Sequence, residues 1–207
     1  MLRSRPSAGG AVNLVNHPCN IVFLVGFVVY MAIRQVYMAR TKETEKSVSR
    51  IDGIEKVLLV VVFAGSLLVP VLYLLTQLFA FADYVPPAYA PWCGAAMMVP
   101  ALWLFWRSHA DLGLNWSMSL EMRREHELVR TGVYRRMRHP MYAAIFMFGI
   151  AQALLLPNWV AGLSALVSFA PMYVVRTPRE ERLMIEAFGE EYEAYMRETW
   201  RVFPKLG

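Results

Sequence analysis

The sequence contains one uninterrupted stretch of 35 residues, 141–175, without a single Lys, Arg, Asp or Glu. Two further uncharged stretches cover residues 57–82 and 85–106. A helix of a soluble protein carries charge on its outward face, so stretches of this length exclude an ordinary soluble globule. Because 57% of all residues are hydrophobic and 18% charged, a disordered chain and a disulfide-rich secreted module are also excluded. The sequence therefore predicts an all-α integral membrane protein.

The longest uncharged stretch is too long for one transmembrane helix. It would extend roughly 52 Å at 1.5 Å per residue, against a hydrocarbon core of about 30 Å. Pro157-Asn158 near its middle is a turn signal, so we predict that the last two spans form a tight helical hairpin. The five predicted transmembrane helices are approximately residues 19–33, 57–81, 89–106, 141–156 and 159–175. We expect them to form a single membrane domain that covers residues 1–207.

The basic residues predict the orientation in the membrane. Segments 34–56, 107–138 and 176–205 carry six, seven and six Lys or Arg residues, whereas the two remaining connections carry none. Five spans place all three basic segments on one side, which is cytoplasmic by the positive-inside rule. The N-terminus is then outside and the C-terminus cytoplasmic, in the cell (inner) membrane if the protein is prokaryotic. The net charge of +5 follows this distribution, so we expect the lipid bilayer as a partner and no nucleic acid.

The four histidines and two cysteines form no pattern of metal ligands or redox pairs, so no metal site is predicted. Cys19 and Cys93 are both expected near the outer face. Whether they pair stays open.

Candidate chemical groups lie in the predicted cytoplasmic regions 107–140 and 176–207. In the run 138–142, Pro140 suits the first turn of a helix, whose positive end attracts a carboxylate or another electron-rich group. The alternative, a basic cluster that reaches anionic lipid, is favoured for Arg135 and Arg136. For His139, a specific hydrogen-bonding role is at least as well supported.

Arg176 and Glu180 are four residues apart and share one helix face if the last span continues. One interpretation is an ordinary ion pair that contributes a few tenths of a kcal/mol. Charged residues at the edge of the hydrocarbon are costly, however, and are usually functional. An arginine there can hold a carboxylate by two parallel hydrogen bonds. A glutamate can bind an ammonium group or ribose hydroxyls.

Together these motifs resemble the isoprenylcysteine carboxyl methyltransferase family. The similarity covers roughly the last hundred residues in detail, and the five-span layout is similar to the compact prokaryotic members. The first half of the pattern consists of Asp111-Leu112-Gly113, Asn115-Trp116, His126-x-Leu128-Val129, Gly132-x-Tyr134 and Arg138-His139-Pro140-x-Tyr142. The second half consists of Arg176-x-x-x-Glu180-Glu181, Phe188-Gly189, Tyr192, Tyr195 and Phe203-Pro204.

The resemblance implies a carboxyl O-methyltransferase that uses S-adenosyl-L-methionine and releases S-adenosyl-L-homocysteine. It implies that Arg176 binds the carboxylate of a prenylated cysteine or a similar lipophilic acceptor, as in a protein-S-isoprenylcysteine O-methyltransferase. The cofactor-binding residues that it implies are His126, Glu127, Leu128, Val129, Tyr134, His139, Pro140, Met141, Tyr142 and Glu180.

Three alternatives remain open at this point. The same superfamily pattern extends to methyltransferases that act on a phospholipid amine or a thiol, and more distantly to NADPH-dependent sterol reductases. A non-enzymatic membrane scaffold is a third alternative, although a scaffold does not need these cytoplasmic motifs.

Methyl transfer to a carboxylate needs no general base, because the carboxylate is already ionised at pH 7. The lack of a Ser-His-Asp or Cys-His pattern in the sequence agrees with such a reaction.

Overall fold

The computed structural model describes residues 18–41, 46–49, 53–76, 78–113, 121–123 and 127–205. Its main helices are α1 (Pro18–Thr41), α2 (Gly53–Phe63), α3 (Val69–Leu75), α4 (Ala90–Leu112), α5 (Pro140–Leu155), α6 (Trp159–Phe188) and α7 (Glu190–Glu198). A π-helical turn, η1 (Ala64–Leu68), joins α2 to α3, and η2 (Ala80–Ala82) and η4 (Gly132–Arg135) are short 3₁₀ helices. The predicted α-helical class is confirmed.

One feature that we did not predict is a pair of short antiparallel strands, β1 (Lys46–Ser49) and β2 (Glu121–Arg123). In their register Ser49 lies opposite Glu121. Strands of three and four residues are too short to give a period-2 signal in the sequence. Their pairing brings the segment after α1 beside the segment before η4.

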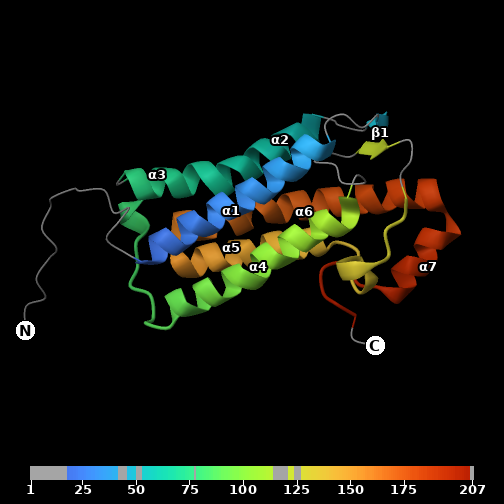
Figure 1. The fold of residues 1–207 in the computed structure, drawn as a ribbon. Coiled ribbons are helices and arrows are strands. Elements are labelled where there is room, and N and C mark those ends of the chain that lie inside the picture. The colour runs from blue at the N-terminus through green and yellow to red at the C-terminus, as the bar shows by residue number, and fades with distance from the viewer. Residues whose placement is uncertain are drawn as a thin grey trace, which may run out of the picture.

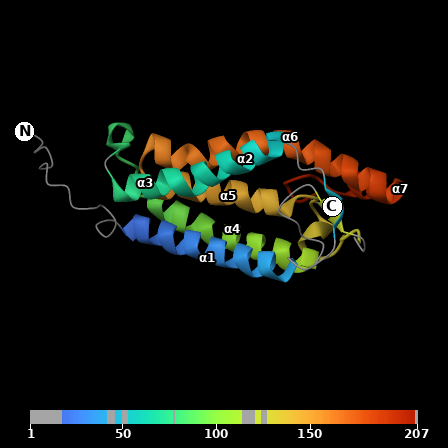
Figure 2. The same cartoon turned by 90° about the horizontal axis from the view of Figure 1, so that it is seen from above.

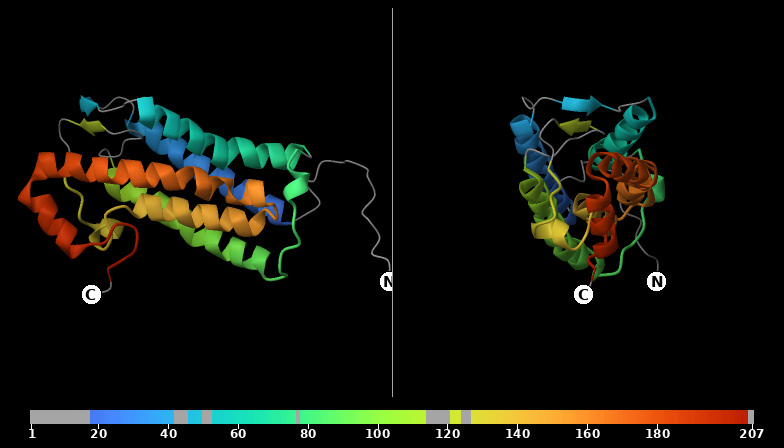
Figure 3. Two further views of the ribbon diagram at one scale, coloured as in Figure 1. Left: turned by 180° about the vertical axis from the view of Figure 1, so that it is seen from behind. Right: turned by 90° about the vertical axis from the view of Figure 1, so that its right-hand side faces the viewer.

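The helices form an elongated bundle with α5 in its middle (Figures 1 and 2). Helices α1 and α4 pack against each other and against α5, whereas α2, η1 and α3 pack against α6. The strand pair, η4, α7 and the C-terminal segment gather at one end of the bundle (Figures 1 and 3). The bundle therefore has two sides, with α1 and α4 on one and α2, α3 and α6 on the other (Figure 2).

Three helical stretches are long and apolar enough to cross a membrane: Pro18–Arg40, Gly53–Leu75 and Trp159–Phe188. Helix α5 is apolar but shorter. The outward faces of the bundle carry many exposed large apolar side chains, among them Val25 and Val28 on α1, Val60 on α2 and Val167 on α6. Extended apolar surface of this kind marks contact with lipid or a partner. An integral membrane protein is thus supported, while the count of five spans and the orientation stay predictions.

The hairpin turn predicted at Pro157-Asn158 is confirmed. Asn158 caps α6, because its side-chain oxygen accepts hydrogen bonds from the backbone N–H groups of Val160 and Ala161 at 3.0 and 2.8 Å. The Asn158 amide also donates to the Phe79 carbonyl at 2.6 Å and to Asp83 at 2.8 Å. The turn between α5 and α6 is therefore fixed to the segment that follows α3.

The end of one predicted span was wrong, and three helices continue beyond the predicted spans. The second predicted span reaches residue 81, but α3 ends at Leu75 and Thr76 is extended. The last predicted span stops at residue 175, but α6 continues to Phe188 through Pro171 and Pro178. Helices α1 and α4 likewise run on to Thr41 and Leu112. Each predicted span was ended where an apolar stretch ends. A helix can continue beyond that point wherever its backbone groups and polar side chains have hydrogen-bond partners.

Both cysteines, Cys19 and Cys93, are free thiols. Among the described residues, no group of three or more His, Cys, Asp or Glu side chains is arranged to hold a metal ion.

Candidate active site

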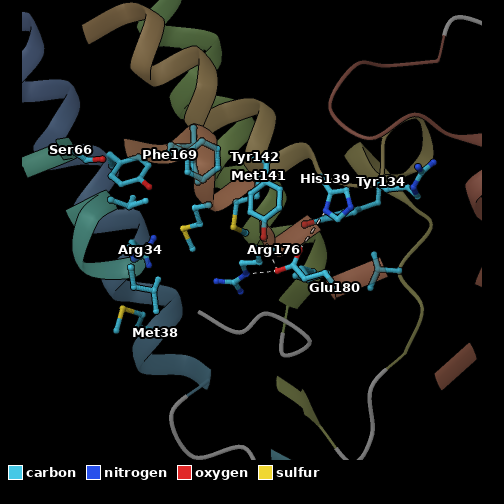
Figure 4. Close-up of a pocket in the computed structure, with 18 of the residues that line it drawn as sticks. Arg34, Met38, Ser66, Tyr134, His139, Met141, Tyr142, Phe169, Arg176 and Glu180 are labelled. Atoms are coloured by element: carbon cyan, nitrogen blue, oxygen red, sulfur yellow. Dashed lines mark hydrogen bonds and ion pairs between the residues drawn. The ribbon is translucent and has the colours of Figure 1, made fainter. Parts of the chain in front are cut away.

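A cavity of about 460 Å³ lies between the two sides of the bundle, toward the end that carries η4 and α7. This volume is within the range of about 300–1,000 Å³ typical of small-molecule sites. Side chains from α1, α2, η1 and the middle of α6 give it a mostly apolar wall, which includes Phe27, Leu59, Leu67 and Phe169. The start of α5, η4 and the end of α6 give it a polar end (Figure 4).

The centre of the polar end is the carboxylate of Glu180. Its Oε1 atom accepts the Nε–H of Arg176 at 2.6 Å and the hydroxyl of Tyr142 at 2.7 Å. Arg176 and Glu180 lie one turn apart because α6 continues beyond the uncharged stretch. Tyr142 comes from the first turns of α5 and also stacks on His139 with its ring nearly parallel, at 5.3 Å between centroids.

A second carboxylate reaches Arg176 from another helix. Glu55, in the first turn of α2, places Oε1 3.4 Å from Nη1 of Arg176. Both side chains are deeply buried, with Glu55 only 3% exposed and Arg176 7% exposed. A buried charge is costly unless it is paired, so Glu55 and Glu180 together explain how Arg176 is accommodated at this depth.

His139 lies between two adjacent glutamates of α6. Its Nδ1 is 3.6 Å from Oε2 of Glu180, and its Nε2 is 3.4 Å from Oε1 of Glu181. The His139 backbone N–H also donates to the Arg201 carbonyl at 2.7 Å. The specific polar role expected for this histidine is therefore supported by its surroundings, whereas Arg135 and Arg136 are exposed.

Glu181 connects the C-terminal segment to the start of α5. Its carboxylate accepts hydrogen bonds from Arg138 at 3.2 Å and from Arg201, whose closest contact is 2.7 Å. Arg138 in turn donates to the carbonyl groups of Met196 and Thr199. The hydrogen bond to Glu181 raises the pKa of Arg201 further above its usual value. The segment that follows α7 is thereby fixed beside His139.

The loop before α5 is held by Asp111 and by Tyr195. Gly132 has φ of +59°, which glycine adopts without the penalty that a side chain would bring. Next to it, the Val133 N–H donates to Oδ2 of Asp111 at 2.9 Å. The Tyr195 hydroxyl of α7 donates to the Tyr134 carbonyl at 2.5 Å. Burial raises the pKa of the Tyr195 phenol, so it keeps this proton at neutral pH. The 3₁₀ turn η4, which begins at Gly132, is therefore held by both α4 and α7.

The cavity brings together most of the predicted site residues. Those that line it are Glu127, Leu128, Val129, Tyr134, His139, Met141, Tyr142, Arg176 and Glu180. Pro140 is the buried first residue of α5 and does not line it. His126 lies outside the described residues.

Three residues at or near the cavity were given no role from the sequence alone: Glu55, Arg34 and Glu181. Glu55 and Arg34 belong to no motif. The spacing of residues along one helix does not indicate which residues of another helix they contact. Glu181 was part of the family pattern but was given no role. Tyr192 of α7, which belongs to the same family pattern and was also given no role, lines the cavity.

The fold and the cavity define a helical membrane protein with a ligand-sized site, charged at one end and apolar along its wall. Among known protein families, residues 94–186 match the isoprenylcysteine carboxyl methyltransferase (ICMT) family. The resemblance expected from the sequence motifs is therefore confirmed. The matched region contains most of α4, all of α5 and most of α6, but neither α1 nor α2.

Individual relatives carry the same name. Over 72 residues the chain is 38% identical to the human protein-S-isoprenylcysteine O-methyltransferase, covering 35% of this chain and 25% of the relative. It is 31% identical over 85 residues to protein-S-isoprenylcysteine O-methyltransferase B of Arabidopsis thaliana, covering 40% and 43%. It is 29% identical over 86 residues to the Dictyostelium discoideum enzyme, covering 42% and 36%. The matched segment thus spans less than half the length of these relatives.

A solved structure entitled the eukaryotic intramembrane Ras methyltransferase ICMT is also similar. The alignment covers 90% of this chain and 73% of that one, at 18% sequence identity and a TM-score of 0.46.

Proposed function

We propose that the protein is an S-adenosyl-L-methionine-dependent membrane methyltransferase that methylates the carboxylate of a prenylated cysteine or a similar lipophilic acceptor. The observation that carries this proposal is the cavity, which joins an apolar wall to a polar end containing Arg176. A lipophilic carboxylate has the same division into a long apolar chain and one anionic group. The matched family and the names of the relatives agree with this chemistry.

The polar end suits the methyl donor. Glu180 and Glu127 both line the cavity, and carboxylates can accept hydrogen bonds from an ammonium group or from ribose hydroxyls. Tyr142 orients Glu180 by its hydrogen bond. Bound S-adenosyl-L-methionine supplies the methyl group on its sulfonium. Besides these residues, we propose that His126, Leu128, Val129, Tyr134, His139, Pro140 and Met141 form the cofactor site.

In the proposed mechanism Arg176 binds and orients the acceptor carboxylate. The carboxylate is already ionised at neutral pH, so no side chain has to remove a proton. Positioning and the exclusion of water supply most of the rate, because opposite charges are partly neutralised as the methyl group moves. The buried position of Arg176, next to the apolar side chains Met172 and Phe169 in the same cavity, provides such an environment.

We further propose that the chain is one domain with five transmembrane helices, an external N-terminus and a cytoplasmic active site. Helix α1 packs with α4 and α5, whereas α2 packs with α6, and the cavity lies between α1 and α2. A lipophilic acceptor would enter from the bilayer through this gap, while the cofactor would enter from the cytosol.

An amine acceptor is a second candidate, and one observation favours it. Arg176 contacts two carboxylates, those of Glu55 and Glu180. The immediate surroundings of Arg176 are therefore more anionic than a carboxylate acceptor would prefer, and an ammonium group would be attracted there.

Two measurements on the purified protein test the proposal. S-adenosyl-L-homocysteine should raise the thermal unfolding temperature and NADPH should not, since a ligand that binds only the folded state stabilises it. Transfer of a radiolabelled methyl group to an N-acetyl-S-prenylcysteine, but not to a phospholipid amine, should then identify the acceptor. A shift with NADPH alone would support a reductase instead. No shift with S-adenosyl-L-homocysteine would overturn both methyltransferase candidates.

A further inference from the structure

Helix α1 places one arginine inside the cavity. Arg34 lies within the candidate membrane span Pro18–Arg40 and lines the cavity wall opposite the polar end of α6. Figure 4 shows Arg34 on α1 and Arg176 on α6, facing the cavity from different helices. Arginine is rare within membrane spans and is retained there mostly for function. Arg40, six residues closer to the end of α1, is exposed and lies over the Tyr37 ring instead.

The arginines that line the cavity differ in their partners. Arg176 contacts Glu55 and Glu180, and Arg138 contacts Glu181. In the part of the chain that the structure describes, no salt bridge joins Arg34 to a carboxylate. The hydroxyl of Tyr30, one turn earlier on α1, lies close enough to the Arg34 side chain to interact with it.

Tyr30 offers the guanidinium of Arg34 a neutral partner. Its ring stacks on Phe105 of α4 with 4.1 Å between centroids and lies 5.0 Å from the ring of Phe148 on α5. Because the tyrosine ring is held by two neighbouring helices, its hydroxyl offers Arg34 a partner at a fixed position. A neutral hydroxyl can orient a guanidinium but leaves its charge without a counter-ion.

The charged residues around the cavity indicate which kind of ligand group would neutralise Arg34. Arg176 is the residue expected to bind the acceptor carboxylate, yet two glutamates already surround it. An acceptor carboxylate that approaches Arg176 alone meets their repulsion. A second cation on the opposite wall offsets that repulsion and requires an anionic ligand of its own.

We propose that Arg34 is a specificity-determining residue that binds the acceptor's carboxylate from the α1 wall, together with Arg176 on α6. The inference rests on the proposed methyltransferase function and deepens it, because it assigns recognition of the acid group to a helix outside the matched region 94–186. Two arginines select a carboxylate acceptor over the amine that the surroundings of Arg176 alone would favour.

A carboxylate at Arg34 has two possible sources, the acceptor and the methionyl part of the cofactor. The experiment therefore measures both. The purified full-length protein and its Arg34→Gln, Arg34→Lys and Arg40→Gln variants are assayed for KM and kcat with an N-acetyl-S-prenylcysteine. Binding of the matching carboxamide, which is neutral and unreactive, is measured as inhibition. Binding of S-adenosyl-L-homocysteine is measured by thermal shift.

Arg34→Gln should raise the acceptor KM by about tenfold or more, the effect of losing one charge-assisted hydrogen bond. Inhibition by the carboxamide and the S-adenosyl-L-homocysteine shift should stay as in the wild type. Arg34→Lys should recover part of the KM, and Arg40→Gln should match the wild type. A purely structural role would change all three readouts together.

Three results would overturn the inference. An unchanged acceptor KM in Arg34→Gln would remove Arg34 from acceptor recognition, and a selective loss of S-adenosyl-L-homocysteine binding would assign it to the cofactor. If the wild-type protein itself binds S-adenosyl-L-homocysteine but methylates no prenylcysteine, the proposed acceptor class fails and the inference fails with it. That last result is seen in the wild type, so it is distinct from a failure of Arg34 alone.

Discussion

Arg176 donates its Nε–H to Oε1 of Glu180 across one turn of α6, at 2.6 Å. The same oxygen accepts the hydroxyl of Tyr142 from α5, so the pair lies where the two helices of the hairpin meet at the cavity. The residue proposed to bind the acceptor is thus hydrogen-bonded to a residue proposed to bind the cofactor. Binding of either ligand would help to position the group that holds the other.

Replacing Arg176 should remove most of the activity. Arg176→Gln is expected to lower kcat/KM for a prenylcysteine by about 100-fold, because truncating one member of a buried charged pair costs about 2–5 kcal/mol. Arg176→Lys should recover little, since an ammonium group cannot make two parallel hydrogen bonds to a carboxylate. Stabilisation by S-adenosyl-L-homocysteine should remain detectable in both variants but weaker than in the wild type, because Glu180 loses the hydrogen bond from Arg176. Full activity of Arg176→Gln would refute the assigned role.

The hydroxyl of Tyr142 should matter for cofactor binding. Tyr142→Phe removes one hydrogen bond to Glu180, and a hydrogen bond to a charged group contributes about 1.5–3 kcal/mol. We expect the Kd for S-adenosyl-L-homocysteine to rise about tenfold, measured by calorimetry. Tyr173→Phe is the matched control, because Tyr173 contacts the Tyr142 ring from α6 but does not line the cavity. Equal effects of the two substitutions would contradict the prediction.

Glu181 should stabilise the protein without touching a ligand. Glu181→Ala leaves the buried Arg138 without its carboxylate, and breaking a buried pair typically costs about 3–5 kcal/mol. The free energy of unfolding in detergent should fall by that order, and residues 199–205 should be cleaved faster by protease. Glu193→Ala, at an exposed position of α7, should change neither. A Glu181→Ala variant as stable and as protease-resistant as the wild type would show that the contacts of Glu181 with Arg138 and Arg201 do not stabilise the fold.

Two glycines with a similar positive φ should respond differently to alanine. Gly132 and Gly113 have φ of +59° and +57°, so alanine is strained at either position, at a cost of about 1–3 kcal/mol. Only at Gly132 would the added Cβ also meet the carboxylate of Asp111, whereas nothing lies within 4 Å at Gly113. Gly132→Ala should therefore lower the unfolding temperature more than Gly113→Ala. Equal shifts in thermal denaturation would mean that Asp111 moves aside freely.

Several features of the fold follow from neighbouring residues alone. The Pro157-Asn158 turn, the start of α5 at Pro140 and the turn at Gly132 each depend on the conformation of one or two residues. The contact between Arg176 and Glu180 follows from helical spacing once α6 continues. These features could be predicted because the backbone preferences and the helical period act over a few residues.

Helix ends were less predictable. The last span was predicted to stop at the first charged residue, but α6 continues through Arg176 and Pro178 to Phe188. The charges do not end the helix, because partners from other helices satisfy them. Those partners, such as Glu55, are distant in the sequence and are identified only by the packed structure.

The sequence by itself determined the membrane-type helices, the hairpin and the motifs that carry the chemistry. The tertiary structure decided which charges meet: Glu55 beside Arg176, the C-terminal segment beside His139, and Arg34 on the wall across the cavity. The physical reason is that spacing along a helix fixes only neighbours within about one turn. Contacts between helices depend on how whole side-chain surfaces pack, which no single motif encodes.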